Sequence, residues 1–439
     1  MPPLILLLYA LGGTLVSIPL ACVPALHIYN VVGLLVLYTT HSQHSVRPEC
    51  LAMFSLGMVV GYAILNTIPS IFVSAPDEST VWIVLPAQTY LTRGRGFEAA
   101  LLTGLGSLGG LLALICLAPI ASRALVPLYN VLKPHLHWLL GLMALYLVLS
   151  EWPKDTGRGK SRLIRLWRGL RAPVAGLLTF TLAGLLGLIL WYRPITPLSI
   201  SFVQLTPAFV GMFAVPFVLT RILSREQMPQ QYICDSIDLM PKALASGVIA
   251  GVFGGLLAAL FPVITAGIGG LFAGHATAQR DDRAFIISQG ASKAVYYCGG
   301  ILISFLPGFG ITRGGLSWML QPFYDPRTWS EYWIAVTAVS LCGALSITAL
   351  VVLSRWVARL VERISYRWVS IGTLIILLLL VVGLSGFGGL LICVAAAGIG
   401  LIPTVFHCRR SQCMGLLLLP ILLNMADLGS VVAGWLDLI

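Results

Sequence analysis

The chain has 439 residues, of which 58% are hydrophobic and only 10% are charged, and its mean hydropathy is +0.93. Soluble domains carry about 25% charged residues, so this composition excludes a soluble globular protein and predicts an all-α polytopic membrane protein. The formal net charge of +11 is concentrated in a few loops. That distribution excludes a nucleic-acid-binding surface and is typical of loops on the cytoplasmic side of a membrane.

Apolar runs of the length that a membrane helix needs follow one another along the chain. Because several runs are short or interrupted by proline, we expect about ten to thirteen membrane segments, some of them re-entrant. The first run is expected to be the first span and not a removed signal peptide, since no basic segment precedes it. The expected spans are roughly 3–23, 25–41, 51–72, 97–121, 136–150, 173–192, 202–223, 242–262, 284–305, 331–354, 368–384, 386–404 and 412–436.

Two parts of the chain share an organisation that predicts an internal repeat. The glycine-rich run 11–24 ends at a proline, as does the run 250–262, and each is followed by an apolar segment that opens with Ser-x-Gly. The later loop 355–367 carries four arginines and the earlier loop 122–135 only two basic residues, which favours inverted copies. The expected division is 1–150 as the first half, 151–172 as a basic cytoplasmic loop, 173–241 as connecting segments, 242–367 as the second half and 368–439 as C-terminal helices.

The stretch 69–80, with two prolines and two acids, interrupts the apolar pattern. A broken backbone at membrane depth must be buried in protein or line a wet cavity, and ionisable groups there are functional candidates. Asp77 and Glu78 are therefore predicted to bind a coupling cation or carry a proton. The alternative is that Asp77 only caps the helix that follows. Further oxygen ligands are expected from Ser74, Ser79 and Thr80.

Lys293 lies just inside an apolar segment, where its ammonium group would attract an anionic substrate. The alternative is that it reaches out to the membrane interface. After the first proline break, His27, Tyr29 and Asn30 lie where a helix N-terminus would offer free N–H groups to an anion, although His27 could also be a packing residue. The substrate site is expected to include Ser288, Gln289, Ser292 and Tyr296 as well.

Two arginine pairs, Arg93 with Arg95 and Arg409 with Arg410, are predicted to contact lipid headgroups or only to mark the cytoplasmic side. Nine cysteines without a CxxC spacing predict neither disulfides nor a metal site. The chain has no Walker A, HExxH or GxSxG motif, so we expect no enzyme activity and no cofactor.

Several blocks together resemble the permease subunit of the tripartite tricarboxylate transporters, above all its archaeal-type branch. The family's proline-glycine pairs are replaced here by Pro24-Ala25 and Pro262-Val263, which restricts the backbone at both positions. The blocks that carry the resemblance, in the expected order, are Ile18–Asn30, Pro69–Thr80, Arg93–Ala100, Leu105–Gly110 and Gly400–Pro420.

The broken segments and the ionisable residues beside them predict a secondary transporter that moves an anion such as a carboxylate by alternating access, coupled to a cation or proton. The resemblance implies a multi-pass protein of a prokaryotic cytoplasmic membrane, in contact with lipids and with partner membrane subunits. A more distant resemblance to the polyprenyl-phosphate transporter family suggests an alternative, a flippase for a lipid-linked phosphate. A third interpretation is a non-transporting membrane subunit of a larger complex. Solid packing of both proline loops would favour that third interpretation.

Overall fold

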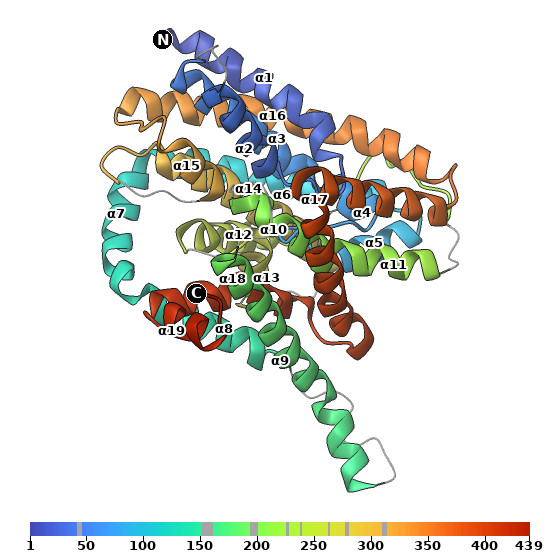
Figure 1. The fold of residues 1–439 in the computed structure, drawn as a ribbon. Coiled ribbons are helices and arrows are strands. Elements are labelled where there is room, and N and C mark those ends of the chain that lie inside the picture. The colour runs from blue at the N-terminus through green and yellow to red at the C-terminus, as the bar shows by residue number, and fades with distance from the viewer. Residues whose placement is uncertain are drawn as a thin grey trace. The chain divides into compact units, whose positions relative to one another are not determined.

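A computed structural model describes residues 1–41, 46–151, 161–193, 201–224, 228–237, 239–261, 264–276, 281–309 and 314–439. Within these ranges all regular elements are helices, as Figure 1 shows. The chain forms two compact units that alternate along the sequence. Unit 1 comprises 1–129 and 221–373, and unit 2 comprises 130–220 and 374–439.

Unit 1 contains both predicted proline breaks and most of the expected site residues. Its helices are α1 (Pro3–Ala21), α2 (Ile28–His41), α3 (Pro48–Leu65), α4 (Thr67–Phe72), α5 (Val84–Thr92), α6 (Gly96–Leu117), α12 (Pro241–Leu260), α13 (Ala266–Ala276), α14 (Asp282–Ser304), α15 (Gly314–Leu320) and α16 (Trp329–Val361).

Unit 2 is built mainly from the later helices of each half of the chain. Three helices, α7 (Ala121–Leu132), α11 (Val215–Leu223) and α17 (Tyr366–Phe406), continue from one unit into the other. The helices of unit 2 alone are α8 (Leu136–Leu149), α9 (Arg162–Tyr192), α10 (Ser201–Phe209), α18 (Gly415–Met425) and α19 (Gly429–Trp435).

The multi-pass, all-helical class is confirmed. Among the described residues, 8 helices are long and apolar enough to cross a membrane, or up to 9 with one bent pair. Two expected spans, 368–384 and 386–404, correspond to the two parts of α17, which meet at Gly386, where a φ of 67° and a ψ of −166° interrupt the helix. Two others belong to one helical run from Gly96 to Leu149.

The basic segment expected as a cytoplasmic loop falls partly on residues 152–160, which lie outside the described part. Its remainder is not a loop, since Arg162 to Arg171 are the first turns of the long helix α9. Ser161 caps this helix by accepting a hydrogen bond from the N–H of Ile164 at 3.3 Å.

Glycines allow the helices of unit 1 to pack backbone against backbone. A Cβ at Gly57 of α3 would lie 1.8 Å from the carbonyl oxygen of Ala10 in α1, and one at Gly251 of α12 would lie 2.4 Å from that of Ser288 in α14. The contacts advance in step along both helices of each pair, so α1 runs parallel to α3, and α12 parallel to α14. Small residues at such contacts are the usual means of helix association in membranes.

The pair α1–α3 runs antiparallel to the pair α12–α14. Ala52, near the start of α3, lines the same cavity as Ser304 at the end of α14. Fourteen residues farther along α3, Asn66 bonds Lys293 in the middle of α14 at 2.5 Å. The pair α1–α3 and the pair α12–α14 therefore run in opposite directions within unit 1.

We expect the contact between α6 and α14 to be sensitive to a single methyl group. A Cβ at Gly106 would lie 2.0 Å from the carbonyl oxygen of Ile287, so Gly106→Ala should force the helices apart and destabilise the protein by about 1–3 kcal/mol. Thermal unfolding of the detergent-solubilised protein measures this. Gly372→Ala is the control, because nothing lies within 4 Å of its Cβ position. Equal unfolding midpoints for the two variants would contradict the packing argument.

The first proline break keeps the conformation of a glycine although it contains an alanine. α1 ends at Ala21, and Ala25 adopts a φ of 53° before α2 begins at Ile28. This left-handed conformation costs a residue with a Cβ about 1–2 kcal/mol. The loss of glycine at Pro24-Ala25 therefore leaves the turn in place, at an energetic cost. The matching pair Pro262-Val263 lies outside the described residues.

Candidate functional site

Buried polar side chains gather in unit 1 where α3, the segment 73–83, α14 and the start of α2 meet. None of them is more than 7% exposed. A buried polar side chain without a hydrogen-bond partner is energetically costly. The partners of each side chain therefore decide whether it can still bind a proton, a cation or an anion. We call the set the polar centre, and its members are His27, Tyr62, Asn66, Asp77, Glu78, Lys293 and Tyr297.

The carboxylate of Asp77 is saturated with hydrogen bonds. Its Oδ1 accepts from the backbone N–H and the hydroxyl of Ser79 at 3.0 and 2.8 Å, and from those of Thr80 at 2.9 and 2.8 Å. Its Oδ2 accepts from the hydroxyl of Tyr62 at 2.5 Å and from the amide of Asn66 at 3.0 Å. A carboxylate offers about four lone-pair sites, so six donors leave no room for a further ligand. Asp77 thus holds the broken segment together.

Lys293 is connected to Asp77 through one amide side chain. Its Nζ donates to Oδ1 of Asn66 at 2.5 Å, and Nδ2 of Asn66 donates to Asp77. The lysine side chain is 1% exposed and therefore does not reach an interface within unit 1. A buried ammonium needs a counter-charge, and Asp77 supplies it through the polarised amide.

His27 and Glu78 form a second pair in the polar centre. Nε2 of His27 lies 3.2 Å from Oε1 of Glu78 and 3.1 Å from the hydroxyl of Tyr297. Nδ1 of His27 accepts the backbone N–H of Tyr29 at 3.2 Å. Because Nδ1 is an acceptor, the proton of the neutral ring is assigned to Nε2, where it faces Glu78.

This hydrogen bonding bears on whether the centre holds a metal ion. Ligand atoms of His27, Asp77 and Glu78 lie within 4.8 Å of one another, which is close enough for a shared cation. However, Asp77 is saturated, and His27 presents an N–H toward the centre in place of a lone pair. In the described part of the chain, the carboxylate of Glu78 has one polar side-chain partner, His27. Glu78 is therefore the group with acceptor capacity for a proton or a small cation.

Three tyrosines enclose the imidazole of His27. The ring centroids of Tyr29, Tyr62 and Tyr297 lie 4.6, 5.2 and 6.0 Å from that of His27. Tyr62 and Tyr297 also meet edge to face at 5.8 Å. Sequence reasoning missed Tyr62, Asn66 and Tyr297 as site residues. The available signal was an asparagine four residues after a tyrosine in an otherwise apolar run, which places both on one helix face.

The second break contributes the start of α13 to the same region. The hydroxyl of Ser292 donates to the carbonyl oxygen of Ala266 at 2.9 Å, and the Cβ position of Gly267 lies 3.0 Å from the carbonyl oxygen of Glu78. The side chain of Gln289 lies against the first turns of α13, next to Gly270. The hydroxyl of Thr265 and the amide nitrogen of Gln289 are buried without a hydrogen-bond partner among the described residues.

The other residues expected at the site lie near the polar centre in different roles. Ser288 donates to the carbonyl oxygen of Phe285 within α14 at 2.8 Å. Tyr296 stacks edgewise on Tyr297 at 4.8 Å, and the N–H of Asn30 donates to the carbonyl oxygen of His27 at 3.0 Å. Ser74 does not join Asp77, because its hydroxyl bonds that of Tyr366 at 2.9 Å and accepts from Gln88.

The four arginines have separate surroundings. Arg93 is exposed, and Arg95 forms a two-pronged ion pair with Glu98 at 2.6 and 2.7 Å. Arg409 and Arg410 belong to unit 2. There the N–H of Arg409 donates to Glu151 at 2.6 Å, and the guanidinium of Arg410 lies 3.2 Å from the ring centre of Phe217.

Comparison with known proteins agrees with the motifs in the sequence. Residues 7–415 match the tripartite tricarboxylate transporter TctA family. An uncharacterized protein of Methanocaldococcus jannaschii is 24% identical over 434 residues, which cover 95% of this chain and 98% of that protein. No solved structure matches the chain.

Proposed function

This chain belongs to the tripartite tricarboxylate transporter TctA family, and from that premise we propose that it carries a carboxylate anion across the cell membrane, coupled to a proton or monovalent cation. The family implies a multi-pass permease component that works with partner subunits. The polar centre is the observation that carries the finer proposal. It places acids, a lysine and a histidine at a buried break between membrane helices, where ionisable groups serve transport.

The charges of the polar centre support coupling. With each group in its ordinary charge state, Asp77 and Glu78 contribute two negative charges and Lys293 one positive, while His27 is neutral, so the centre carries −1. A buried centre of that charge repels an anion strongly, because the surroundings screen little. A proton or small cation at Glu78 brings the centre to zero. The cation therefore loads first and raises the affinity for the anion, and by linkage the anion raises the affinity for the cation.

The anion subsite is assigned to the lysine side of the centre. The N-terminus of α13 carries a partial positive charge and lies beside α14, as Ser292 shows by its bond to Ala266. Gln289 is one turn before Lys293 on the same helix face, and Thr265 precedes α13. Their buried polar atoms, which have no partner among the described residues, are suited to a carboxylate.

Alternating access is supported by the direction of the helices. Helix α1 precedes the first proline break and α3 follows it, and α12 and α14 flank the second break in the same way. The two pairs run in opposite directions. Inverted repeats with broken helices commonly rock around a central site. The depth of the site favours a soluble anion over a lipid-linked phosphate, since a lipid would need the polar centre to open toward the membrane, whereas its members are at most 7% exposed.

Uptake of radiolabelled mono-, di- and tricarboxylates into proteoliposomes tests this function. We expect wild-type protein to accumulate at least one of them under an imposed proton or sodium gradient. Lys293→Met should reduce that uptake more than tenfold, because a charged hydrogen bond to the anion contributes about 1.5–3 kcal/mol. Lys242→Met is the control, since this lysine is exposed at the start of α12. Uptake by Lys293→Met at the wild-type rate would rule out the assigned subsite.

A further inference from the structure

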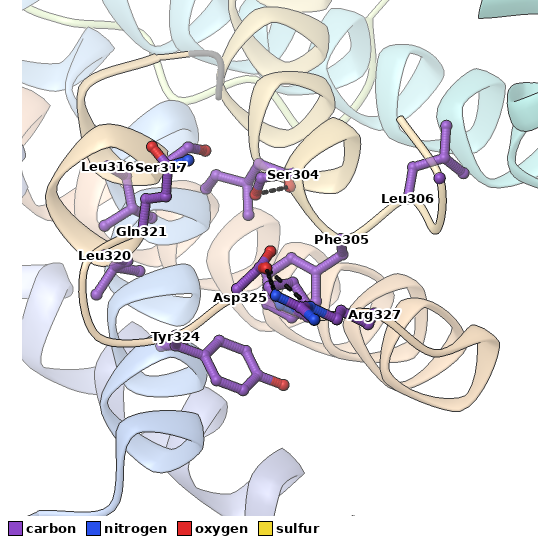
Figure 2. A pocket seen from close by; sticks show the side chains of 14 residues that line it. Ser304, Phe305, Leu306, Leu316, Ser317, Leu320, Gln321, Tyr324, Asp325 and Arg327 are labelled. Carbon is purple, nitrogen blue, oxygen red and sulfur yellow. Dashed lines mark hydrogen bonds and ion pairs between the residues drawn. The ribbon is translucent and has the colours of Figure 1, made fainter. Parts of the chain in front are cut away.

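A cavity of about 490 Å³ lies at one end of unit 1, between α14, α15 and the segment that leads to α16. Figure 2 shows Ser304 and Phe305 on one side and Leu316, Ser317 and Leu320 of α15 on the other. Its volume falls within the range typical of small-molecule sites, roughly 300–1,000 Å³. The hydroxyl of Ser317 is buried and has no partner among the described residues, so the wall offers a neutral polar group to a solute.

The cavity and the polar centre lie on one face of α14. Lys293, Tyr297 and Ile301 follow at intervals of four residues, and Ile301 lines the cavity. Ile301 is therefore about one helical turn, or roughly 6 Å, from Tyr297, whose hydroxyl bonds His27. Ser304 lies about 16 Å along the axis from Lys293.

Helix α3 follows the same course from the other side. Ala52 lines the cavity, and Tyr62 and Asn66, farther along the helix, belong to the polar centre. Ser55 shares their helix face, seven residues before Tyr62, and its buried hydroxyl has no partner in the described part of the chain. On α3, Ser55 thus adds a polar group between the cavity and the polar centre.

One tyrosine separates the cavity wall from the polar centre. The N-terminus of α15 packs on Tyr29, since a Cβ at Gly315 would lie 2.7 Å from the tyrosine ring. The same ring lies 4.6 Å from His27 and 6.0 Å from Tyr297. A displacement of α15 would therefore free Tyr29 from its position against His27.

Charge on α16 and α17 indicates which side of the membrane the cavity faces. Tyr324, which lines the cavity, bonds Glu331 in the first turn of α16 at 2.8 Å. The far end of α16 carries Arg355 and Arg359, followed by Arg363 and Arg367. Arginines concentrate on the cytoplasmic side, so the cavity is on the outer side. At the arginine end, the bond between Ser74 and Tyr366 ties the broken segment to α17.

We propose that the cavity is the outer vestibule through which the carboxylate reaches the polar centre. In this proposal the ring of Tyr29, held in place by α15, blocks the passage between the vestibule and the polar centre. This inference rests on the proposed function for the identity of the solute. It adds a first binding station and the residue that controls passage. At the mouth, Arg327 is paired with Asp325 at 2.8 Å, so the charge there is balanced and the station holds the anion by neutral groups. Weak binding of this kind suits transit.

A cysteine at the vestibule tests its side and its ligand. Ser304→Cys should react with a charged, membrane-impermeant methanethiosulfonate at least tenfold faster in right-side-out vesicles than in inverted ones. Saturating carboxylate should slow the reaction. Lys242→Cys, at the arginine end, should show the opposite preference, and the wild-type chain gives the background of its nine free cysteines. Reaction from the cytoplasmic side alone, or no reaction in folded protein, overturns the proposal.

A second variant tests the tyrosine. Gln289→Cys, beyond the polar centre, should be shielded from the outside reagent, and adding Tyr29→Ala should speed its reaction at least tenfold. Adding Tyr29→Phe should leave it shielded, because the ring is retained. Equal rates with alanine and phenylalanine would overturn the role of Tyr29. Labelling does not require transport, so a protein that labels as expected without accumulating any carboxylate contradicts the proposed function alone. Labelling from outside that no carboxylate slows contradicts the vestibule as a binding station.

Discussion

Asp77→Asn is expected to destabilise the protein by about 3–5 kcal/mol, more than most substitutions in the chain. The carboxylate accepts six hydrogen bonds, and an asparagine amide turns one acceptor into a donor that faces the donors of Tyr62 and Asn66. The change also removes the counter-charge of Lys293. Thermal unfolding in detergent and the monodisperse fraction after extraction measure the effect.

Glu78→Gln is the matched control for this prediction, because it makes the same chemical change at the adjacent residue. Glu78 has a single polar side-chain partner in the described part of the chain, so its glutamine variant should fold with a midpoint close to that of wild type. If Asp77→Asn unfolds no earlier than Glu78→Gln, Asp77 is not the anchor of the broken segment.

The second large effect is expected for the Glu78→Gln variant, in which transport should no longer be coupled to a cation or proton gradient. An amide cannot take up a proton or balance a cation, so the variant should lose accumulation driven by a gradient by at least tenfold. Its polar centre is permanently neutral, however, and the anion subsite is intact. Exchange of labelled for unlabelled carboxylate at equal concentrations should therefore persist. Uptake and exchange in the same proteoliposomes provide the measurement.

A comparison with His27→Gln sharpens the result for Glu78. Glutamine retains a donor toward Glu78 and leaves the carboxylate in place, so accumulation should continue, with an altered pH profile. Loss of exchange together with accumulation in folded Glu78→Gln would show that the carboxylate takes part in binding the anion. Accumulation at the wild-type rate would remove Glu78 from coupling.

Much of the helical framework follows from the sequence, because apolar runs and prolines dominate it. Every expected span coincides with a helix or part of one, from α1 to the bent pair at the C-terminus. The number of crossings stays a prediction, since a proline or glycine within a run does not tell whether a helix kinks or ends. Gly386, whose backbone angles are not helical, interrupts α17 between the two spans expected there, and Ala25 turns the chain although it carries a Cβ.

The chemistry of the site was only partly predictable. The acids, the lysine and the histidine were candidates because ionisable residues are conspicuous in apolar segments, and the structure brings them together. Their partners were not, because Asn66 and Lys293 are 227 positions apart and only the packing of α3 on α14 brings them together. The sequence also treated Asp77 and Glu78 as one pair. The hydrogen bonds separate them into an anchored residue and a responsive one.

Helix α14 has a consequence for how the protein is made. Its 23 residues are enough to span a bilayer, yet it is absent from the described helices that qualify as spans by hydropathy. Lys293 alone costs about 2.5–3.5 kcal/mol at the centre of a membrane during insertion. The helix therefore depends on neighbours already in place, and α6 and α12, which pack along it, both emerge from the ribosome earlier. Order of synthesis thus becomes part of the information that specifies the fold.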